Sequence, residues 1–316
     1  MPIVVNTNSA ATTASFNLSK NAEALRKSLA RLSSGNRITQ PSEDAGGLAV
    51  AYKLDSHARR TEAVLNNHQN ALSYLQVQDG VLETVGKVAN RMAELRTMAA
   101  DITKNTDDIE NYSKEFRELQ SQLKQLSLEK FNGISLFAVQ NHKGDTTAVS
   151  GSDTATGGKA FQLSLSAAGA KDIYSYQLLT HPSGVAEEGS ISLNVVNLEF
   201  VTSLGGLGAA GNSLMMANGN ETTDIATVDI ETFTGIIQRI ADARAENGAE
   251  QQRVQQSYEV HQVNLVNLEA AHGRIMDVDV ALESTRFAKN NVLVQASASM
   301  TAQANQLTNI ALTLLQ

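Results

Sequence analysis

The stretch RLSSGNRITQPSEDAGGLAV, Arg31 to Val50, decides how this chain is organised. A leucine-spaced helical pattern reaches it, stops at Ser33–Gly35 and resumes after Pro41. Glycine is common just past a helix end, proline is favoured at the first helical position, and acidic residues there complement the helix dipole. We therefore expect a joint between two helices, with small residues that allow close packing at the start of the second. Its residues are Ser34, Gly35, Pro41, Asp44, Gly46 and Gly47.

The composition of the 316 residues limits the classes of protein and of site. Hydrophobic residues make up 42% but aromatic residues only 4%, which indicates thin helix–helix seams rather than one deep core. A net charge of −8 argues against nucleic acid as the main partner. The absence of cysteine excludes disulfides, thiolate metal sites and cysteine nucleophiles.

Heptad spacing predicts long helices at both ends of the chain. Apolar residues alternate spacings of three and four through the first third, as far as Leu95, and again from Ile236 onward. A shorter helix after KNTDD is expected to end at Phe131–Gly133, and RIMDVDVA is expected to precede the last helix. We expect the terminal helices to pack through Leu18, Leu25, Leu29, Leu32, Leu293, Ala296, Met300, Leu307, Ile310 and Leu314.

The centre of the chain, roughly residues 138–224, has a different texture. Its FQLSLSA and SISLNVVNLEF segments alternate apolar and polar residues with period two, which is typical of strands. The predicted fold class is therefore mainly α. We expect a long antiparallel helical bundle or coiled coil formed by the N- and C-terminal arms, with a small β-rich central insertion domain.

The outermost arms carry few large apolar side chains for their length. Burial of so few side chains does not offset the conformational entropy lost when about 35 residues become ordered. We therefore expect both arms to be disordered in the free monomer and to order only against other subunits. This pattern indicates the subunit of a polymer.

Several motifs resemble chemical sites, and we interpret each of them as structural. Gly206, Gly208 and Gly211 match the G-x-G-x-x-G dinucleotide fingerprint, but no convincing helix follows them. The six histidines do not cluster, and the sequence contains no HExxH zinc motif. Asp277 and Asp279 are interpreted as acidic residues near the start of a helix. We predict no catalytic residue, no metal site and no cofactor.

Neither end of the sequence is expected to enter a membrane. The opening MPIVVNTNSAATTASFNLS has neither the basic region nor the continuous apolar core of a cleavable signal peptide. The last 27 residues are apolar enough to suggest a transmembrane helix, but asparagines and glutamines such as Gln295 and Asn305 make bilayer insertion too costly.

With these residues considered, the chain closely resembles bacterial flagellin, the filament subunit of the flagellum. Over about residues 1–138 the resemblance rests on LARLSSGNRITQPSEDAGGLAVAYKL, QNALSYLQVQDGVLETVGKVANRMAELRTMA and FNGISLF. Over about residues 226–316 it rests on RAENGAEQQRV, NLVNLEAAHGRIMDVDVALES and QASASMTAQANQLTNIALTLL. The centre shows no such match.

The resemblance implies filament-core helices at residues 1–40 and 277–316, spoke-domain helices at 41–138 and 226–276, and a variable outer β-rich domain at 139–225. It implies a structural protein rather than an enzyme, which polymerises with itself into the flagellar filament, the propeller for swimming. The implied partners are the flagellar cap and hook-junction proteins, an export chaperone and the type III export apparatus. It also implies secretion to the outside of the cell, with no nucleic-acid or membrane partner.

In many flagellins the spoke domain also contacts a vertebrate Toll-like receptor of innate immunity. The positions of this sequence that match the receptor-contacting motif are Arg91, Glu94, Leu95 and Glu115. The resemblance therefore predicts a receptor contact there.

Three alternatives stay open from the sequence. A hook–filament junction protein shares flagellin-like ends, although the SSGNRI break and the QANQ terminus favour flagellin. A flagellin carrying a protease in its insertion belongs to a different class, and the zinc motif that it requires is missing. A membrane-active or adhesive module in the central domain is neither supported nor excluded by the composition.

Overall fold

The structure is a computed structural model that describes residues 8–137, 161–163, 173–202, 204, 214–215 and 225–314. The helices are α1 (Ser9–Ser34), α2 (Ala45–Ala99), α3 (Thr106–Ser127), α4 (Leu198–Val201), α5 (Ile230–Met276) and α6 (Val280–Leu314), with a 3-10 turn at Ile225–Thr227. The strands are β1 (Lys130–Phe131), β2 (Ile134–Ser135), β3 (Phe161–Leu163), β4 (Ile173–Leu179) and β5 (Ser190–Val195). The chain forms two units, Met1–Arg59 with Leu265–Gln316, and Arg60–Asn264.

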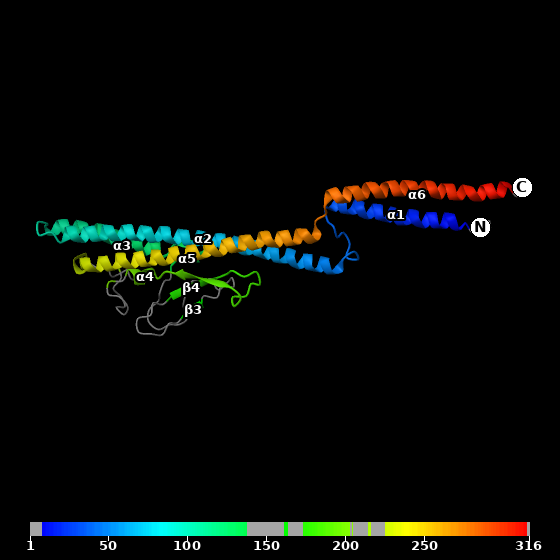
Figure 1. Ribbon diagram of the computed structural model, residues 1–316. Coiled ribbons are helices and arrows are strands. Elements are labelled where there is room, and N and C mark those ends of the chain that lie inside the picture. Colours follow the sequence, from blue (N-terminus) through cyan, green and yellow to red (C-terminus); the bar gives the residue numbers. More distant parts are fainter. Residues whose placement is uncertain are drawn as a thin grey trace. The chain divides into compact units, whose positions relative to one another are not determined.

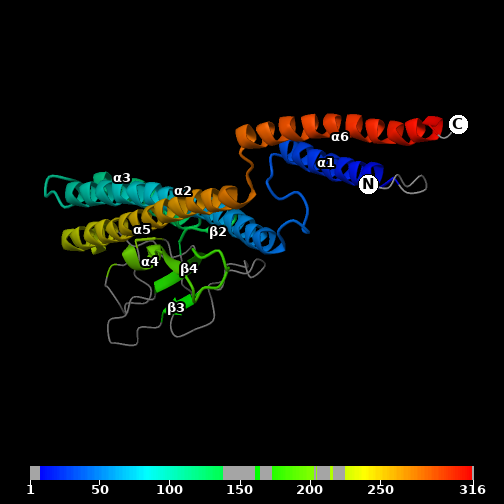
Figure 2. The same cartoon turned by 45° about the vertical axis from the view of Figure 1, so that its right-hand side comes forward.

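The first unit is built around the antiparallel pair of α1 and α6. The two helices lie side by side along their length, and the start of α1 lies at the same end of the pair as the end of α6 (Figures 1 and 2). The Asn8 side chain caps α1 by accepting a hydrogen bond from the N–H of Ala11, and its amide donates to the carbonyl of Ala304 at 2.8 Å. The Asn21 amide similarly donates to the Ser297 hydroxyl at 3.3 Å. These polar contacts fix the register of the pair.

The second unit has the larger hydrophobic core, formed where α2, α3 and α5 pack on one another and on the small strands. Heptad positions of the sequence are buried here as predicted, including Leu75 and Leu82 on α2 and Ile236 on α5. Phe116 of α3 meets Phe233 of α5 edge-to-face, with ring centroids 6.4 Å apart. Such pairs add to the stabilisation that comes from burial alone.

Two small antiparallel sheets complete the second unit. β1 and β2 form a hairpin whose two-residue turn has positive φ at Asn132 and Gly133, the conformation that Asn-Gly favours. The second sheet has the strand order β3-β4-β5, so β5 lies at its edge. The predicted fold class is confirmed: the described chain is mainly helical, with a small strand-containing region between the helical ends.

Three predicted boundaries were wrong. The second long helix begins at Ala45 and not at Pro41, because residues 41–43 form a turn and the Asp44 side chain caps the helix. The shorter helix ends at Ser127, since Phe131–Gly133 belongs to the β1–β2 hairpin. The predicted strand SISLNVVNLEF ends at Val195, and its last residues enter α4. Among the described residues, no helix is long and apolar enough to cross a membrane.

Candidate functional site: the terminal helix pair and its joint

The fully buried residues of the contact between α1 and α6 are small or polar, whereas its large apolar side chains are only half-buried. Ser28 is the buried residue of α1, and the described part of α6 buries Glu283 and Ala304. The Asn290 amide donates to the Ser28 hydroxyl at 3.3 Å inside the contact. The arms are helical in the structure, whereas we expected them to order only against other subunits. The leucines Leu18, Leu25 and Leu32 stay only half-buried in the pair, so part of their apolar surface is left uncovered.

Other large apolar side chains of the pair lie on its outside. Met300 is 64% exposed, whereas a methionine inside a protein–protein interface would be covered. Contiguous exposed apolar surface on a soluble chain typically marks a contact with another molecule. The other exposed large apolar residues of α1 and α6 are Phe16, Leu29, Val280, Leu282, Val292 and Leu293.

The predicted packing residues fall into two groups. Leu18, Leu25 and Leu32 are half-buried, while Leu29 is exposed. On α6 the predicted Leu293, Ala296 and Met300 are exposed, and the half-buried line that faces α1 comes one residue later, at Val294, Ser297 and Thr301. Leu307, Ile310 and Leu314 belong to α6, but their side chains lie outside the described residues. The exposed stripe therefore stays available for contact with other chains.

The joint consists of two connections that are bonded to each other. Gly35 ends α1 in the left-handed conformation with φ of 73°, and its N–H donates to the Arg31 carbonyl at 2.9 Å. The carbonyl of Gly35 accepts from the N–H of Val278 at 3.0 Å, and the N–H of Arg37 donates to the Met276 carbonyl. The Ser34 hydroxyl accepts the N–H of residue 36 at 3.2 Å. The link from α1 to α2 thus pairs with the link from α5 to α6.

Gly47, the last residue of the joint, serves the helix cap, and this corrects our expectation of close helix packing there. The Asp44 carboxylate accepts the N–H of Gly47 at 2.8 Å and so satisfies a free donor of the first turn. A Cβ on Gly47 would collide with that carboxylate, whereas one on Gly46 would meet its nearest neighbour at 3.7 Å. Gly46 itself is exposed, as is Pro41 in the turn before the cap.

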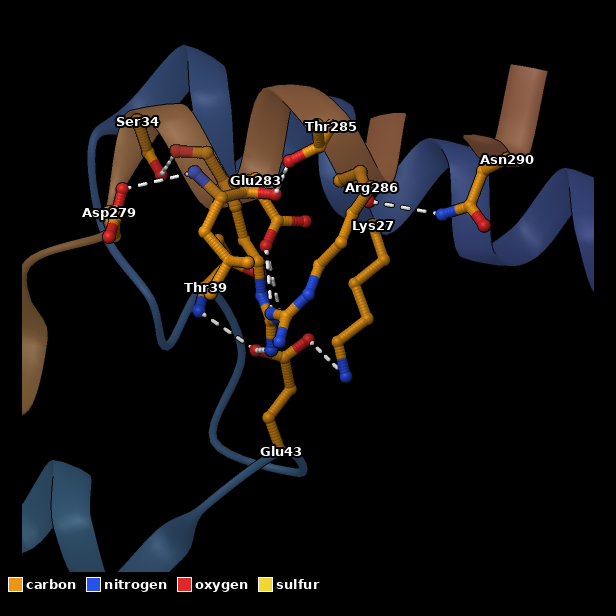
Figure 3. A network of polar contacts seen from close by, with 12 residues as sticks. Lys27, Ser34, Thr39, Glu43, Asp279, Glu283, Thr285, Arg286 and Asn290 are labelled. Carbon is orange, nitrogen blue, oxygen red and sulfur yellow. Dashed lines mark hydrogen bonds and ion pairs between the residues drawn. The ribbon is translucent and has the colours of Figure 1, made fainter. Parts of the chain in front are cut away.

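A network of charged side chains ties α1, the joint and α6 together (Figure 3). Glu43, which reaches back from the turn before α2, binds Lys27 Nζ at 2.8 Å and Arg31 Nη2 at 3.4 Å. Arg31 Nη1 also lies 3.9 Å from Glu283 of α6, and Arg286 Nη1 lies 3.3 Å from the same carboxylate. Arg31 therefore stands between two carboxylates that are nearly buried, with side chains 11% and 3% exposed.

The groups around Glu43 favour the ionised form of its carboxyl group. Burial acts to raise the pKa of Glu43, but hydrogen bonds from Lys27 and from the Thr39 N–H, together with the charges of Arg31 and Lys27, lower it below its usual value. Sequence reasoning missed this network, because heptad spacing carries no information on charged residues that meet across a turn. The sequence signal for the network was that Arg31 and Glu43 both lie in the stretch where one helix ends and the next begins.

The residues predicted to contact a receptor are only partly available for one. Arg91 is half-exposed and binds Glu115 at 2.7 Å and Glu94 at 3.1 Å. The hydrogen bond with Glu115, followed by that with Glu94, raises the pKa of Arg91. Leu95, in contrast, is fully buried in the hydrophobic core. The three charged residues form one surface cluster, and Leu95 supports it from beneath.

The motifs interpreted as structural can be placed as far as the structure describes them. His68 is buried, with Nδ1 2.7 Å from the Val64 carbonyl and Nε2 2.9 Å from the Ser257 hydroxyl. Asp279 caps α6 by accepting the N–H of Leu282 at 3.0 Å. Gly206, Gly208 and Gly211 lie outside the described residues. Within the described part of the chain, no group of His, Cys, Asp and Glu is placed to hold a metal ion.

Comparison with known proteins agrees with this architecture of paired helical ends around a different centre. Residues 5–142 match the model of the bacterial flagellin N-terminal helical region, and residues 230–315 match that of the C-terminal helical region. The chain is 31% identical to the flagellin of Bacillus subtilis over 309 residues, which covers 96% of both chains. It is 29% identical over 315 residues to flagellin FlaB2 of Treponema pallidum, covering 99% of this chain and all of the relative.

The fold and the exposed helix pair define a structural subunit of a helical polymer. The chain belongs to the bacterial flagellin family. It is a structural subunit that polymerises into the bacterial flagellar filament, the propeller for swimming motility. Another matched relative, from Treponema phagedenis, is named a flagellar filament core protein and is 29% identical over 317 residues, with 99% of this chain and all of that protein covered.

Proposed function

We propose that the outer face of the α1–α6 pair is the surface through which subunits contact one another in the filament core. One observation carries this proposal: the pair leaves large apolar side chains such as Leu29, Leu293 and Met300 exposed on its outside. Burial of apolar side chains is the dominant favourable term in most protein association. Neighbouring copies of the pair would supply the apolar partners that the single chain lacks.

We propose that the segments of the chain have the structural roles that the resemblance to the family implies. Residues 1–40 and 277–316 form the filament core, 41–138 and 226–276 the spoke domain, and 139–225 the outer domain. The joint at Ser34–Gly47 then transmits the geometry of the core to the spoke domain. Its paired connections and the Arg31 network support this role, since both link the end of α1 to the start of α6.

The remaining partners are inferred from membership of the family. We propose that an export chaperone and the type III export apparatus carry the subunit out of the cell, and that the flagellar cap and hook-junction proteins meet it at the ends of the filament. Its role is mechanical, without catalysis, and without nucleic-acid or membrane partners. The acidic net charge of −8 supports the exclusion of nucleic acid.

Truncation tests the proposed surface. Removal of residues 1–40 or of residues 277–316 should abolish long filaments in electron micrographs, because each deletion removes one helix of the pair. The hydrophobic core of the second unit should remain, so the truncated chains should keep a cooperative thermal unfolding transition. Normal long filaments from either truncated chain would contradict the proposal.

Copy number separates a filament subunit from a hook–filament junction protein. A filament subunit should make up most of the protein in a sheared and washed filament preparation, whereas a junction protein is present in few copies. Quantitative mass spectrometry of such a preparation measures the ratio. A trace amount of this chain beside another dominant polypeptide would favour the junction role.

A further inference from the structure

At Asn194 the free edge of strand β5 is fastened to the helices by side chains, and just beyond the strand Val196 forms an isolated main-chain bridge with Phe137. β5 pairs with β4 on one side, with Asn194 opposite Ser175. In an antiparallel ladder, alternate residues of an edge strand turn both main-chain groups outward. The N–H of Asn194 donates to the Glu250 carboxylate at 3.0 Å, and its carbonyl accepts from the Gln78 amide at 3.3 Å. At Asn194, one acceptor from α5 and one donor from α2 thus take the place of a neighbouring strand.

The Gln78 half of this attachment does not depend on pH. The Gln78 amide is fully buried and also donates to the Leu136 carbonyl at 2.9 Å. Its own carbonyl accepts from the Asn247 amide at 2.7 Å, and Gln251 in turn donates to Asn247. Because amides do not titrate, this chain of hydrogen bonds holds its side of the strand edge in the same way at every pH.

The Glu250 half can change its charge. Both carboxylate oxygens of Glu250 lie within 3.1 Å of the Asn194 nitrogen, and Glu246, one turn earlier on α5, accepts from the Asn194 side chain at 3.5 Å. Two carboxylates therefore converge on one strand residue. Of the charged and titratable groups that act on Glu250, Glu246 repels its negative charge and Arg253 attracts it, while the phenol of Tyr74 on α2 feels the charge of Glu250.

We propose that this strand edge is a proton-controlled latch, in which docking of the central sheet on α2 and α5 tightens when Glu250 is protonated and loosens when Glu250 and Glu246 are both charged. The latch acts on the attachment of the outer segment and not on the α1–α6 pair. It therefore goes beyond the proposed assembly surface and does not depend on it.

The direction of the effect follows from the carboxyl group's surroundings. Burial raises the pKa of Glu250 from 4.5 to about 7; the Asn194 hydrogen bond and Arg253 oppose the rise, and Glu246 adds to it. A group whose pKa is higher in the docked state binds its proton more tightly there. The stabilisation of the docked sheet by this proton is fully present below pH 4.5 and is lost as the pH rises through about 7. Acidification thus favours the docked sheet.

Amide hydrogen exchange of the full-length chain tests the latch. Protection factors, which divide out the pH dependence of intrinsic exchange, are measured for β5 peptides at about pH 5 and about pH 8.5, on either side of the transition. We expect the protection factors of residues 190–195 to fall on the order of 10- to 100-fold at the higher pH. This range is smaller than the full pKa shift of Glu250 implies, because solvent screens a carboxylate that is partly exposed. Peptides from α5 around Ile240 should keep their protection, which separates local undocking from global unfolding.

Two substitutions make the test specific. Glu250→Gln keeps an oxygen acceptor for Asn194 without a charge, so its β5 protection should be the same at both pH values. Glu259→Gln, an exposed position on the same helix, should keep the wild-type profile. A flat profile in the wild-type chain, or an unchanged pH dependence in Glu250→Gln, would overturn the latch. Because the readout needs no filaments, it is independent of whether the assembly surface is correct.

Discussion

The carbonyl of Gly35 accepts a hydrogen bond from the N–H of Val278 at 3.0 Å, although the two residues are far apart in sequence. Gly35 is the residue that ends α1, and Val278 lies in the short link that precedes α6. The two connections that leave the terminal helix pair are therefore joined to each other. A change in the conformation of one connection must be accompanied by a change in the other, so the joint responds as a unit.

Substitution of Gly35 by proline should change the filament. Proline cannot adopt the φ of 73° found at this position, and it removes the N–H that donates to Arg31. We expect altered filament shape or loss of assembly in electron micrographs, with monomer secondary structure by circular dichroism largely intact. Gly46→Ala is the matched control, because a Cβ there has room, and its filaments should be normal.

The helix cap at Asp44 gives a second prediction. Gly47→Ala places a Cβ against the Asp44 carboxylate, and we expect a loss of about 1 kcal/mol in the free energy of unfolding, the usual cost of losing an N-cap. Urea unfolding followed by circular dichroism measures the loss. In an Asp44→Ala background the same change should cost nothing, since the cap is already gone. Equal cost in both backgrounds would show that the cap is not the reason for glycine at position 47.

The central position of Arg31 predicts a large effect of its removal. Arg31→Ala leaves the nearly buried carboxylates of Glu43 and Glu283 with fewer partners, and breaking such a pair costs about 3 kcal/mol. Glu283→Gln in the same chain should restore part of the loss, because it removes one of the nearly buried charges that has lost a partner. Arg59→Ala, which breaks an exposed pair with Asp55, should cost less than about 0.5 kcal/mol.

The same network predicts a pH dependence. The pKa of Glu43 is lowered in the folded chain. Its contribution to stability is therefore present above pH 4.5 and is lost as the pH falls below that value. Urea midpoints of the wild-type chain should therefore decrease on acidification below that value. The decrease should be smaller in Glu43→Gln. Identical acid profiles of the two chains would show that Glu43 does not stabilise the joint.

The prediction of receptor contact can be tested with the purified monomer in a Toll-like receptor reporter assay. Arg91→Ala should weaken the response, because Arg91 holds the exposed cluster with Glu94 and Glu115 together. Arg59→Ala is a control, since it removes an exposed arginine from another part of α2. Absence of a response to the wild-type monomer would reject the prediction.

The sequence was sufficient to predict the helices of the second unit because their heptad positions face a single core. Leu75, Leu82 and Ile236 follow the pattern and are buried together. The same reasoning does not work for α6, where both faces carry apolar or small residues. A stripe at Leu293 and Met300 looks like an internal seam, yet α1 covers the residues one position later. Spacing shows that a face will be covered, but it does not show whether the same chain or another chain covers it.

The joint was predictable in place but not in detail. Glycine and proline located the break between the helices, because each has a narrow preference at helix ends. The pairing of Gly35 with Val278 and the approach of Glu283 to Arg31 join residues more than two hundred positions apart. Such contacts depend on how the helices pair, which local sequence patterns do not encode.

The central claim is that the exposed apolar face of the α1–α6 pair builds the filament, and a double substitution on that face tests it most directly. Leu293→Gln with Met300→Gln changes two exposed side chains, so the monomer should unfold within about 0.5 kcal/mol of the wild-type chain. Val185→Gln, an exposed apolar residue of the central segment, is the control and should leave assembly unchanged. The measurement is the lowest protein concentration at which filaments form, followed by light scattering and electron microscopy. The account predicts a strong increase or no filaments for the double variant, and wild-type assembly by that variant would contradict it.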